Sequence, residues 1–330
     1  MVCLDRRGVA DSGALRTDPR DVQANHLPTL RIGTRGSPLA LAQAHLVARL
    51  LRAAHEGLPE PEIVVIKTTG DSVLDRALSE VGGKGLFTKE IEEALIEERI
   101  DLAVHSMKDM PTVLPPGLEI VALLEREDPR DAFLSPVAAD VAGLPAGALV
   151  GTASLRRQAQ ILNARPDVRV ETLRGNVNTR LDKLARGEVQ ATLLALAGLR
   201  RLGLDHHATS ILSVEEMLPA VAQGAIGIEV RGADRIVRPL VEALDHRETT
   251  LAVDAERALL AALDGSCRTP IAALAILDGS GGLSLESRIF SYDGRRVLAT
   301  SRKGSAADGI AMGADAGAEL LDRVGPGFFG

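Results

Sequence analysis

The stretch LRIGTRGSPLALAQAHLVARLLRAA, from Leu30 to Ala54, contains the pattern that decides the fold. It opens with an apolar run of strand length, which breaks at glycine and is followed by Ser37 and Pro38. Serine is favoured at the N-cap of a helix and proline at its first position, so these two residues predict a helix start. The residues from Pro38 onward follow a helical pattern. A strand that turns directly into a helix is the repeating unit of α/β proteins.

The same alternation of strand-length and helical patterns recurs along the first two thirds of the chain. It next predicts a strand at 62–68, a helix at 87–97 and a strand at 101–105. It restarts after Pro129, with strands at 148–151, 168–172 and 190–195 and helices at 155–164 and 177–186. We therefore expect two α/β domains, with one continuous sheet as the alternative interpretation.

The pattern changes after Thr249 to that of a small α+β domain. A helix at 251–263 precedes strands at 271–277, 283–290 and 295–300 and a final helix around 306–323. The Gly-rich segment 218–227 predicts a crossing back to the first domain, which supplies a strand at 225–230. The predicted organisation is a disordered tail at 1–28, domain 1 at 29–124 and 222–246, domain 2 at 125–221 and domain 3 at 247–330.

Composition and charge argue against several classes of function. Only 2% of the residues are aromatic and the net charge is −7, which disfavours base stacking, nucleic-acid binding and binding to an anionic membrane. Residues 1–28 lack the apolar run of a secretion signal or membrane anchor, and no histidine pair has metal-ligand spacing. The two cysteines, Cys3 and Cys267, are far apart, so we expect no structural disulfide and a reducing, cytoplasmic compartment.

Positive charge is concentrated where the second α/β domain is predicted. Residues 151–201 contain ten Lys and Arg against four Asp and Glu, although the whole chain is acidic. Arg156 and Arg157 follow the N-cap candidate Ser154, where each cation opposes the helix dipole at a cost of about 0.3–1 kcal/mol. A bound anion would offset that cost. A basic segment inside an acidic protein therefore indicates a localised anion site.

Arginines also follow the other predicted strands. Arg35 stands beside the first helix start, and Arg174, Arg180 and Arg200–Arg201 follow later strands. Ligands of open α/β sheets gather at the carboxyl ends of strands. Each arginine alone is compatible with a solvated surface residue, but the repeated placement indicates a polyanionic substrate, since a charge-assisted hydrogen bond contributes roughly 1.5–3 kcal/mol.

Three further residues are candidates for chemistry. Asp109 follows the strand at 101–105, where a carboxylate can act as a general acid or base or stabilise a developing cation; the alternative is a turn residue that bonds its own backbone. Cys267 lies in a glycine-containing loop beside Arg268, which would activate its thiol, although a free cysteine is more often a small buried apolar residue. Lys84 lies in the loop VGGKGLF, which lacks the spacing of a phosphate-binding loop and is better explained as a flexible closing loop.

Taken together, nine segments resemble the porphobilinogen deaminases, also called hydroxymethylbilane synthases, a family of transferases. The resemblance runs in order from about Leu30 to about Ile276. The segments that carry it are 31–40, 81–87, 104–111, 125–133, 151–158, 173–180, 197–204, 218–227 and 265–271.

The resemblance implies a fold, a reaction and a cofactor. The fold would be two α/β domains similar to type II periplasmic binding proteins, which face each other across a cleft, plus a small α+β domain, in a monomer. Four porphobilinogen units would be joined head to tail with release of ammonia, on a dipyrromethane primer held by Cys267 through a thioether. Hydrolysis would then free hydroxymethylbilane. No metal, nucleic acid or membrane partner is implied.

The resemblance also assigns roles to residues. Asp109 would be catalytic. The cofactor-binding residues would be Cys267, Lys108, Ser106, Thr152, Ser154, Arg156, Arg157 and Arg174. The substrate-binding residues would be Arg35, Ser37, Arg180, Arg201, Lys84 and Gln223. The competing hypothesis is a non-enzymatic two-domain anion-binding protein, which would need neither Cys267 nor Asp109.

Overall fold

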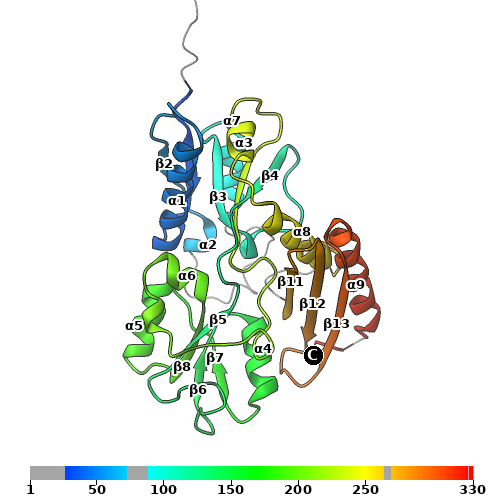
Figure 1. Cartoon of the computed structure of the whole chain (residues 1–330). Coiled ribbons are helices and arrows are strands. Elements are labelled where there is room, and N and C mark those ends of the chain that lie inside the picture. The colour runs from blue at the N-terminus through cyan, green and yellow to red at the C-terminus, as the bar shows by residue number, and fades with distance from the viewer. Residues whose placement is uncertain (1–26, 73–87, 264–268, 326, 330) are drawn as a thin grey trace, which may run out of the picture.

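A computed structural model describes residues 27–72, 88–263, 269–325 and 327–329 of the chain (Figure 1). Its strands form three separate sheets, two of five strands and one of three. The interpretation as one continuous sheet is therefore wrong, because the strands after Pro129 do not pair with those before it, apart from one returning strand. The fold class predicted from the sequence, two α/β units and a small α+β unit, is confirmed.

The first sheet has the strand order β2-β1-β3-β10-β4. The strands β1, β2 and β3 are parallel, whereas β10 runs antiparallel to both of its neighbours. Its strands are β1 (Arg31–Thr34), β2 (Glu62–Val65), β3 (Leu102–Ser106), β4 (Leu118–Leu123) and β10 (Ile226–Arg231). Its helices are α1 (Pro38–Ala54), α2 (Thr69–Ser72), α3 (Lys89–Ile96) and α7 (Val237–Glu242), and the single turn η1 (Met107–Asp109) follows β3.

Helices cover both faces of this sheet. On one face, α1 packs Val47 and Leu51 against Leu102 and Val104 of β3. On the other face, α3 packs Ile91 against the sheet. Burial on both faces is nearly complete for β3 and β10 in the middle of the sheet, where residues of both faces are buried, whereas the edge strand β2 is partly exposed.

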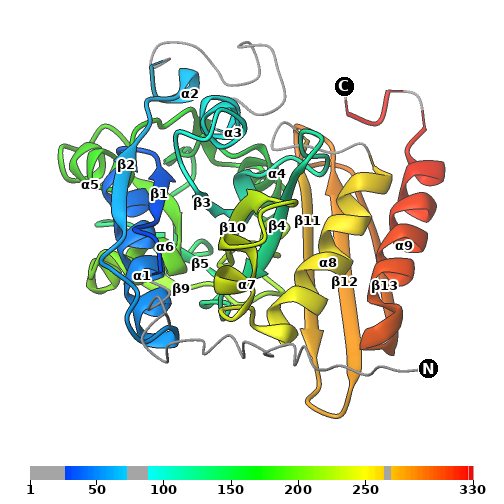
Figure 2. The same cartoon turned by 90° about the horizontal axis from the view of Figure 1, so that it is seen from above.

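The second sheet has the order β7-β6-β8-β5-β9, and β5 is antiparallel to its neighbours just as β10 is in the first. Its strands are β5 (Asp131–Leu134), β6 (Leu149–Gly151), β7 (Arg169–Glu171), β8 (Ala191–Ala195) and β9 (Ser210–Ile211). Its helices are α4 (Leu155–Ala164), α5 (Val177–Ala185) and α6 (Leu196–Arg201), and the turn η2 (Asp205–His207) follows α6. The chain thus crosses between the sheets twice, once before β5 and once before β10 (Figures 1 and 2).

The third sheet is the antiparallel meander β11 (Ile271–Leu277), β12 (Gly282–Phe290) and β13 (Val297–Ser305). Two helices, α8 (Arg247–Ala262) and α9 (Gly309–Arg323), pack on it, and the turn η3 (Ala306–Asp308) precedes α9. The helices approach closely because α9 presents glycines to α8: a Cβ on Gly313 would lie 2.0 Å from the carbonyl oxygen of Ala255.

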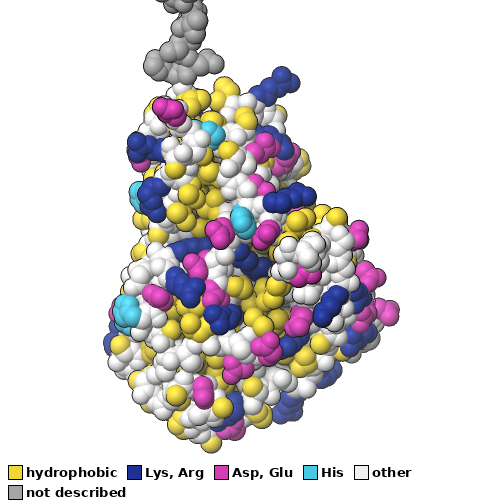
Figure 3. Space-filling view, in the orientation of Figure 1, with side chains coloured by type: hydrophobic (Ala, Val, Ile, Leu, Met, Phe, Trp, Pro, Cys, Tyr) yellow, Lys and Arg dark blue, Asp and Glu magenta, His cyan; other side chains and the backbone are white. Residues whose placement is uncertain are grey.

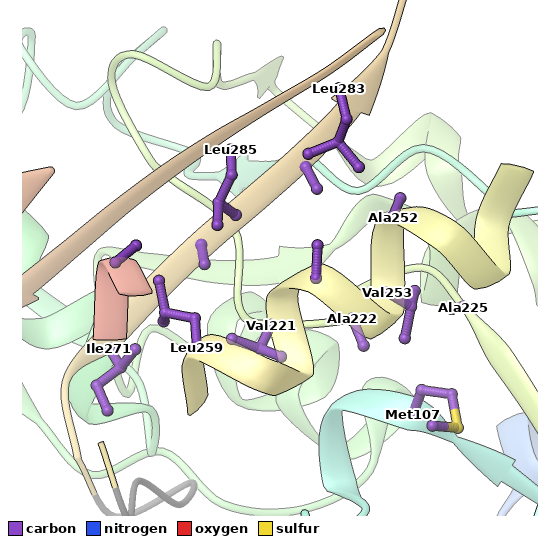
Figure 4. Packing of buried hydrophobic residues seen from close by; sticks show 14 of the residues in the cluster. Met107, Val221, Ala222, Ala225, Ala252, Val253, Leu259, Ile271, Leu283 and Leu285 are labelled. Atoms are coloured by element: carbon purple, nitrogen blue, oxygen red, sulfur yellow. The ribbon is translucent and has the colours of Figure 1, made fainter. Parts of the chain in front are cut away.

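The apolar core of the third unit continues into the crossing segment. Leu259 of α8 and Leu285 of β12 belong to the same buried cluster as Met107, Ala222 and Ala225 (Figure 4). The small α+β unit is therefore packed against the place where the chain passes between the two α/β units.

Several elements differ from the prediction. The strands β4, β5 and β9 and the helices α2, α6 and α7 were not predicted. The predicted domain limits remain a prediction, because pairing between strands does not define where a domain ends. No helix in the described part of the chain is long and apolar enough to cross a membrane.

Candidate active site

A pocket of about 80 Å³ opens at the carboxyl end of β3, beside the start of α1. Its lining includes Arg35 and Ser37 from the β1–α1 junction, Gln43 from α1, and Ser106 and Asp109 from the end of β3. This is where open α/β sheets place their ligands, since loops and helix starts diverge there.

The β1–α1 junction forms as the sequence predicted. Ser37 is the N-cap of α1, and its hydroxyl oxygen accepts a hydrogen bond from the backbone N–H of Ala40 at 3.2 Å, with Pro38 at the first helical position. The positive end of a 17-residue helix therefore faces the pocket beside Arg35, which favours a negatively charged ligand group there.

The end of β3 supplies the polar groups on the other side of the pocket. The Ser106 hydroxyl lies within hydrogen-bonding distance of both side-chain atoms of Gln43, 3.0 Å from Nε2 and 3.2 Å from Oε1. The next turn exposes Asp109 and leaves Lys108 half-buried. Burial and the nearby Arg157 lower the pKa of Lys108 to about 8, while Asp109 opposes that shift.

Arg156 and Arg157 meet a buried carboxylate that the sequence analysis did not anticipate. Asp131, at the start of β5, is fully buried and lies 2.7 Å from Nη2 of each arginine. Burial alone would raise the pKa of Asp131, but the two arginines together hold it well below its usual range. Gln223 also donates from Nε2 to Asp131 Oδ1 at 2.9 Å.

The position of Asp131 shows that the two arginines at the start of α4 do not require the bound anion that the sequence had suggested. The cost of two cations at a helix start is offset within the chain, so it does not by itself require a ligand. The two arginines and one carboxylate still carry a net positive charge, and the buried Nε of Arg156 has no hydrogen-bond partner among the described residues. The sequence did not reveal the pairing of Asp131, because its partners lie 25 and 26 positions along the chain. The one local signal of a buried charge was an aspartate at the start of the apolar run DAFL.

The hydroxyl candidates near α4 serve the local turn. Ser154 caps α4 by accepting from the backbone N–H of Arg157 at 3.4 Å. Thr152 is buried, and its hydroxyl oxygen accepts from the backbone N–H of Ser154 at 3.1 Å. These bonds fix the β6–α4 turn, and with it the two arginines.

Arg180 brings the second sheet's cations to Asp109. It extends from α5, and its Nε donates to the carbonyl oxygen of Gly175 at 2.9 Å. Burial lowers the pKa of Arg180 to about 10, with Arg157 and Arg174 adding to the effect and Asp109 opposing it. Asp109 on one α/β unit and Arg180 on the other are therefore close enough for their charges to interact.

Arg201 and Gln223 hold the crossing segments. Arg201 Nη2 donates to the carbonyl oxygen of Gly224 at 2.5 Å, and burial lowers its pKa to about 10. Gln223 Nε2 also donates to the carbonyl oxygen of Pro129 at 2.7 Å, which joins the two crossings. On the face shown in Figure 3, Lys and Arg side chains gather with acidic ones where the upper and lower parts meet.

The structure places the candidates from the sequence as follows. Arg35, Ser37, Ser106 and Asp109 line one pocket, and the charges of Lys108, Arg156, Arg157, Arg174 and Arg180 interact near it. Thr152 and Ser154 shape the turn at α4, while Arg201 and Gln223 join crossings. Lys84 and Cys267 lie outside the described residues, as does the predicted tail apart from its last two positions.

Two family models match the chain. Residues 30–239 match "Porphobilinogen deaminase, dipyromethane cofactor binding domain", and residues 250–322 match "Porphobilinogen deaminase, C-terminal domain". The chain belongs to the porphobilinogen deaminase family. Its residues 30–239, which include the pocket and the arginines around it, form the dipyrromethane cofactor-binding domain of the family. The hypothesis of a non-enzymatic anion-binding protein is not favoured.

Curated porphobilinogen deaminases are similar over most of the chain. The chloroplastic enzyme of Oryza sativa is 57% identical over 91% of this chain and 85% of its own length. The chloroplastic enzyme of Pisum sativum is 55% identical over 94% of this chain and 86% of its own length. The enzyme of Nitrobacter winogradskyi is 56% identical over 90% of this chain and 94% of its own length.

The solved structures to which this chain shows a distant similarity include periplasmic proteins. The periplasmic VFT2 domain of Bordetella pertussis BvgS is 14% identical, with a TM-score of 0.39, over 65% of this chain and 86% of that one. The periplasmic sulfonate-binding protein SsuA from Methylobacillus flagellatus is 16% identical, with a TM-score of 0.36, over 70% of this chain and 67% of that one.

The residues of this chain fit a dipyrromethane group that carries acetate and propionate side chains. Lys108 interacts with two arginines, Arg156 and Arg157, and two aspartates, Asp109 and Asp131, so with its own charge the group has a net formal charge of +1. A bound polycarboxylate would neutralise that excess, and each charge-assisted contact would contribute roughly 1.5–3 kcal/mol. Arg157, Arg174 and Lys108 are the residues that would hold it, with Arg156 positioned through Asp131.

Proposed function

We propose that this chain is a transferase that joins four porphobilinogen units head to tail, with release of ammonia, and hydrolyses the product to hydroxymethylbilane. The observation that carries this proposal is the pocket that Asp109 shares with Arg35 and the capped start of α1. A carboxylate opposite an arginine suits a substrate that has both a cationic aminomethyl group and carboxylates.

The two ends of the pocket suit opposite ends of porphobilinogen. Arg35 and the capped start of α1 provide a positive field for a substrate acetate or propionate. Asp109, on the other side, would accept hydrogen bonds from the aminomethyl group and stabilise positive charge that develops on the pyrrole nitrogen as ammonia leaves. Arg180 would hold a carboxylate across from Asp109, and Ser37 and Ser106 would add hydroxyl contacts.

The cofactor would be anchored by Cys267. When bound, the dipyrromethane supplies a free pyrrole position at which the product chain is extended. The contribution of this chain is to hold the carboxylates with Arg157, Arg174 and Lys108 and to present the side chain of Asp109 to the reacting groups. Lys84 and Gln223 remain proposed substrate-binding residues; the backbone carbonyl and carboxylate contacts of Gln223 favour a positioning role for its side chain.

The cofactor assignment is tested by the mass of the intact protein. Purified wild-type protein should exceed its sequence mass by one dipyrromethane, Cys267→Ser should remove the increment, and Cys3→Ser should keep it. An active preparation that consists of bare polypeptide would exclude the assignment.

The role of Asp109 is tested by Asp109→Asn. This change keeps the shape of the side chain but removes its charge, so we expect cofactor loading to persist and turnover to fall about 10²–10⁴-fold. Asp140→Asn, which changes an exposed loop aspartate of the second unit, is the matched control and should leave turnover unchanged. Near-wild-type porphobilinogen consumption by Asp109→Asn would remove Asp109 from the mechanism.

We also propose that the protein acts as a cytoplasmic monomer. The family resemblance and the absence of a predicted disulfide support this. Sedimentation of the purified protein and fractionation of cells that express it are the two measurements; a stable dimer or a membrane-associated fraction would contradict the proposal.

A further inference from the structure

A buried set of two carboxyl groups and one imidazole lies on the face of β3 opposite Ser106. His105 is 6% exposed, Glu229 of β10 is fully buried, and Glu92 of α3 is 7% exposed. The His105 Nε2 atom is 2.9 Å from Glu229 Oε2. Successive side chains of a strand point to opposite faces, which is why His105 faces α3 while Ser106 faces α1.

Burial of these three groups lowers the stability of the fold. One oxygen of Glu229 and one oxygen of Glu92 are buried without a hydrogen-bond partner in the part of the chain that the structure describes. A buried polar atom without a partner costs about 1–3 kcal/mol, and a buried ion pair rarely stabilises a protein more than apolar packing would. The cluster therefore needs a reason other than stability.

The position of the cluster supplies that reason. His105 lines the same pocket as Asp109, together with Thr88 and Ile91 from the α3 side. The charged groups beside His105 are Glu229 from β10 and Glu92 from α3. The charged residues that line the pocket with His105 are Asp109 from η1 and Arg35 from the β1–α1 junction.

The proposed reaction also needs a base. At each coupling the C–N bond of the aminomethyl group breaks, and its electron pair leaves with ammonia. A C–C bond then forms to the α-carbon of the next pyrrole, whose C–H bond must break so that the ring regains its aromaticity. Asp109 and His105 are the side chains that can act as a base among the described residues lining the pocket.

We propose that His105, held by Glu229, accepts the proton released from the pyrrole α-carbon at each coupling. This inference rests on the proposed function. With Nε2 engaged by Glu229, Nδ1 is the ring nitrogen that takes the proton, and the carboxylate fixes the ring and stabilises the imidazolium that forms. The proton then passes to solvent or to the departing ammonia, so no oxidant or further reactant is required.

Glu92 sets the charge of the cluster. Burial raises its pKa and Glu229 adds to the rise, while Thr88 and His105 oppose it. The raised pKa of Glu92 favours its uncharged form and so lessens the repulsion between its carboxyl group and that of Glu229.

The test uses holoenzyme, verified by intact mass, and porphobilinogen deuterated at its free α-position. His105→Asn should lower turnover about 10²-fold and raise the deuterium isotope effect on turnover, because C–H cleavage becomes rate-limiting. His55→Asn is the matched control: His55 lies at the opposite end of α1, where Nε2 contacts the carbonyl oxygen of Leu240 at 2.7 Å. This control should change stability only.

Glu229→Gln gives a second measurement that does not require His105 to be replaced. Loss of the carboxylate destabilises the imidazolium, so the base stays neutral to lower pH and the acid limb of the turnover profile should move to lower pH. Turnover of His105→Asn within about threefold of wild type would overturn the proposal. So would a larger loss without a change in isotope effect, or an unmoved profile for Glu229→Gln. Failure of wild-type holoenzyme to form hydroxymethylbilane would instead overturn the proposed function.

Discussion

At the scale of single residues, the charge of the Lys108 side chain makes ligand binding depend on pH. Its pKa is lowered from the usual 10.5 to about 8, because burial and the neighbouring Arg157 both disfavour the ammonium form. The positive charge is therefore present below pH 8 and lost as the pH rises through that value. A carboxylate ligand loses one charge-assisted contact over the same range.

We therefore expect porphobilinogen to bind more weakly above pH 8. Calorimetry with cofactor-free Cys267→Ser protein should show Kd rising about tenfold between pH 7 and pH 9.5, the loss of one such contact. Lys108→Arg retains its charge over this range, so its Kd should stay nearly constant. A Kd of the Cys267→Ser protein that does not change with pH would show that Lys108 does not contact the ligand.

At the scale of elements, the crossing segments are held by close backbone contact. Gly224 has a φ of +92°, and a Cβ placed on it would lie 2.2 Å from the carbonyl oxygen of Glu127 in the other crossing. Gly187 also has a positive φ, +73°, but a Cβ there would meet nothing within 4 Å. Substitution of Gly187 therefore tests backbone strain alone, whereas substitution of Gly224 tests strain together with the contact between the two crossings.

We expect Gly187→Ala to lower the free energy of unfolding by about 1–2 kcal/mol, the cost of an L-residue in this backbone region. Gly224→Ala should lower it further and reduce porphobilinogen turnover, because the two crossings must move apart. Urea unfolding and steady-state rates measure both effects. Equal losses of stability in the two variants would show that the contact with Glu127 is unimportant.

The sequence predicted elements whose signals are local and missed those that depend on distant partners. The helix at 155–164 coincides with α4, since Ser154 and the apolar spacing define it locally. By contrast, β4 pairs only with β10, about a hundred positions along the chain, and β5 begins with a charged residue that pairs with α4. The same limit applied to the site: Asp109 and the arginines stood out, whereas Asp131 and the pair His105–Glu229 needed the fold.

At the scale of the whole molecule, Glu256 of α8 ties the third unit to both crossings. It is fully buried and accepts hydrogen bonds from Arg126 Nη1 at 2.6 Å, from the backbone N–H of Ala222 at 2.6 Å and from that of Ala275 at 2.8 Å. Arg126 precedes β5, Ala222 precedes β10 and Ala275 lies in β11. One carboxylate thus joins three parts of the molecule.

We expect Glu256→Gln to destabilise the protein by about 3–5 kcal/mol, because it leaves the Arg126 guanidinium buried without its counter-charge. Thermal unfolding followed by calorimetry should then separate into more than one transition as the third unit uncouples. The control is Glu319→Gln, whose carboxylate bonds Thr300, Arg302 and Arg323 within one unit and is partly exposed. A similar loss from both variants would show that Glu256 does not couple the units.

The return of β10 into the first sheet has a consequence for biosynthesis. Because β10 lies between β3 and β4, the ribosome must deliver the chain beyond Arg231 before β4 gains its neighbour. The second sheet, in contrast, is made from the continuous run between β5 and β9, which emerges earlier. During translation, the middle of the polypeptide can therefore fold before its beginning, and the nascent β4 edge stays open to chaperones until the second crossing emerges.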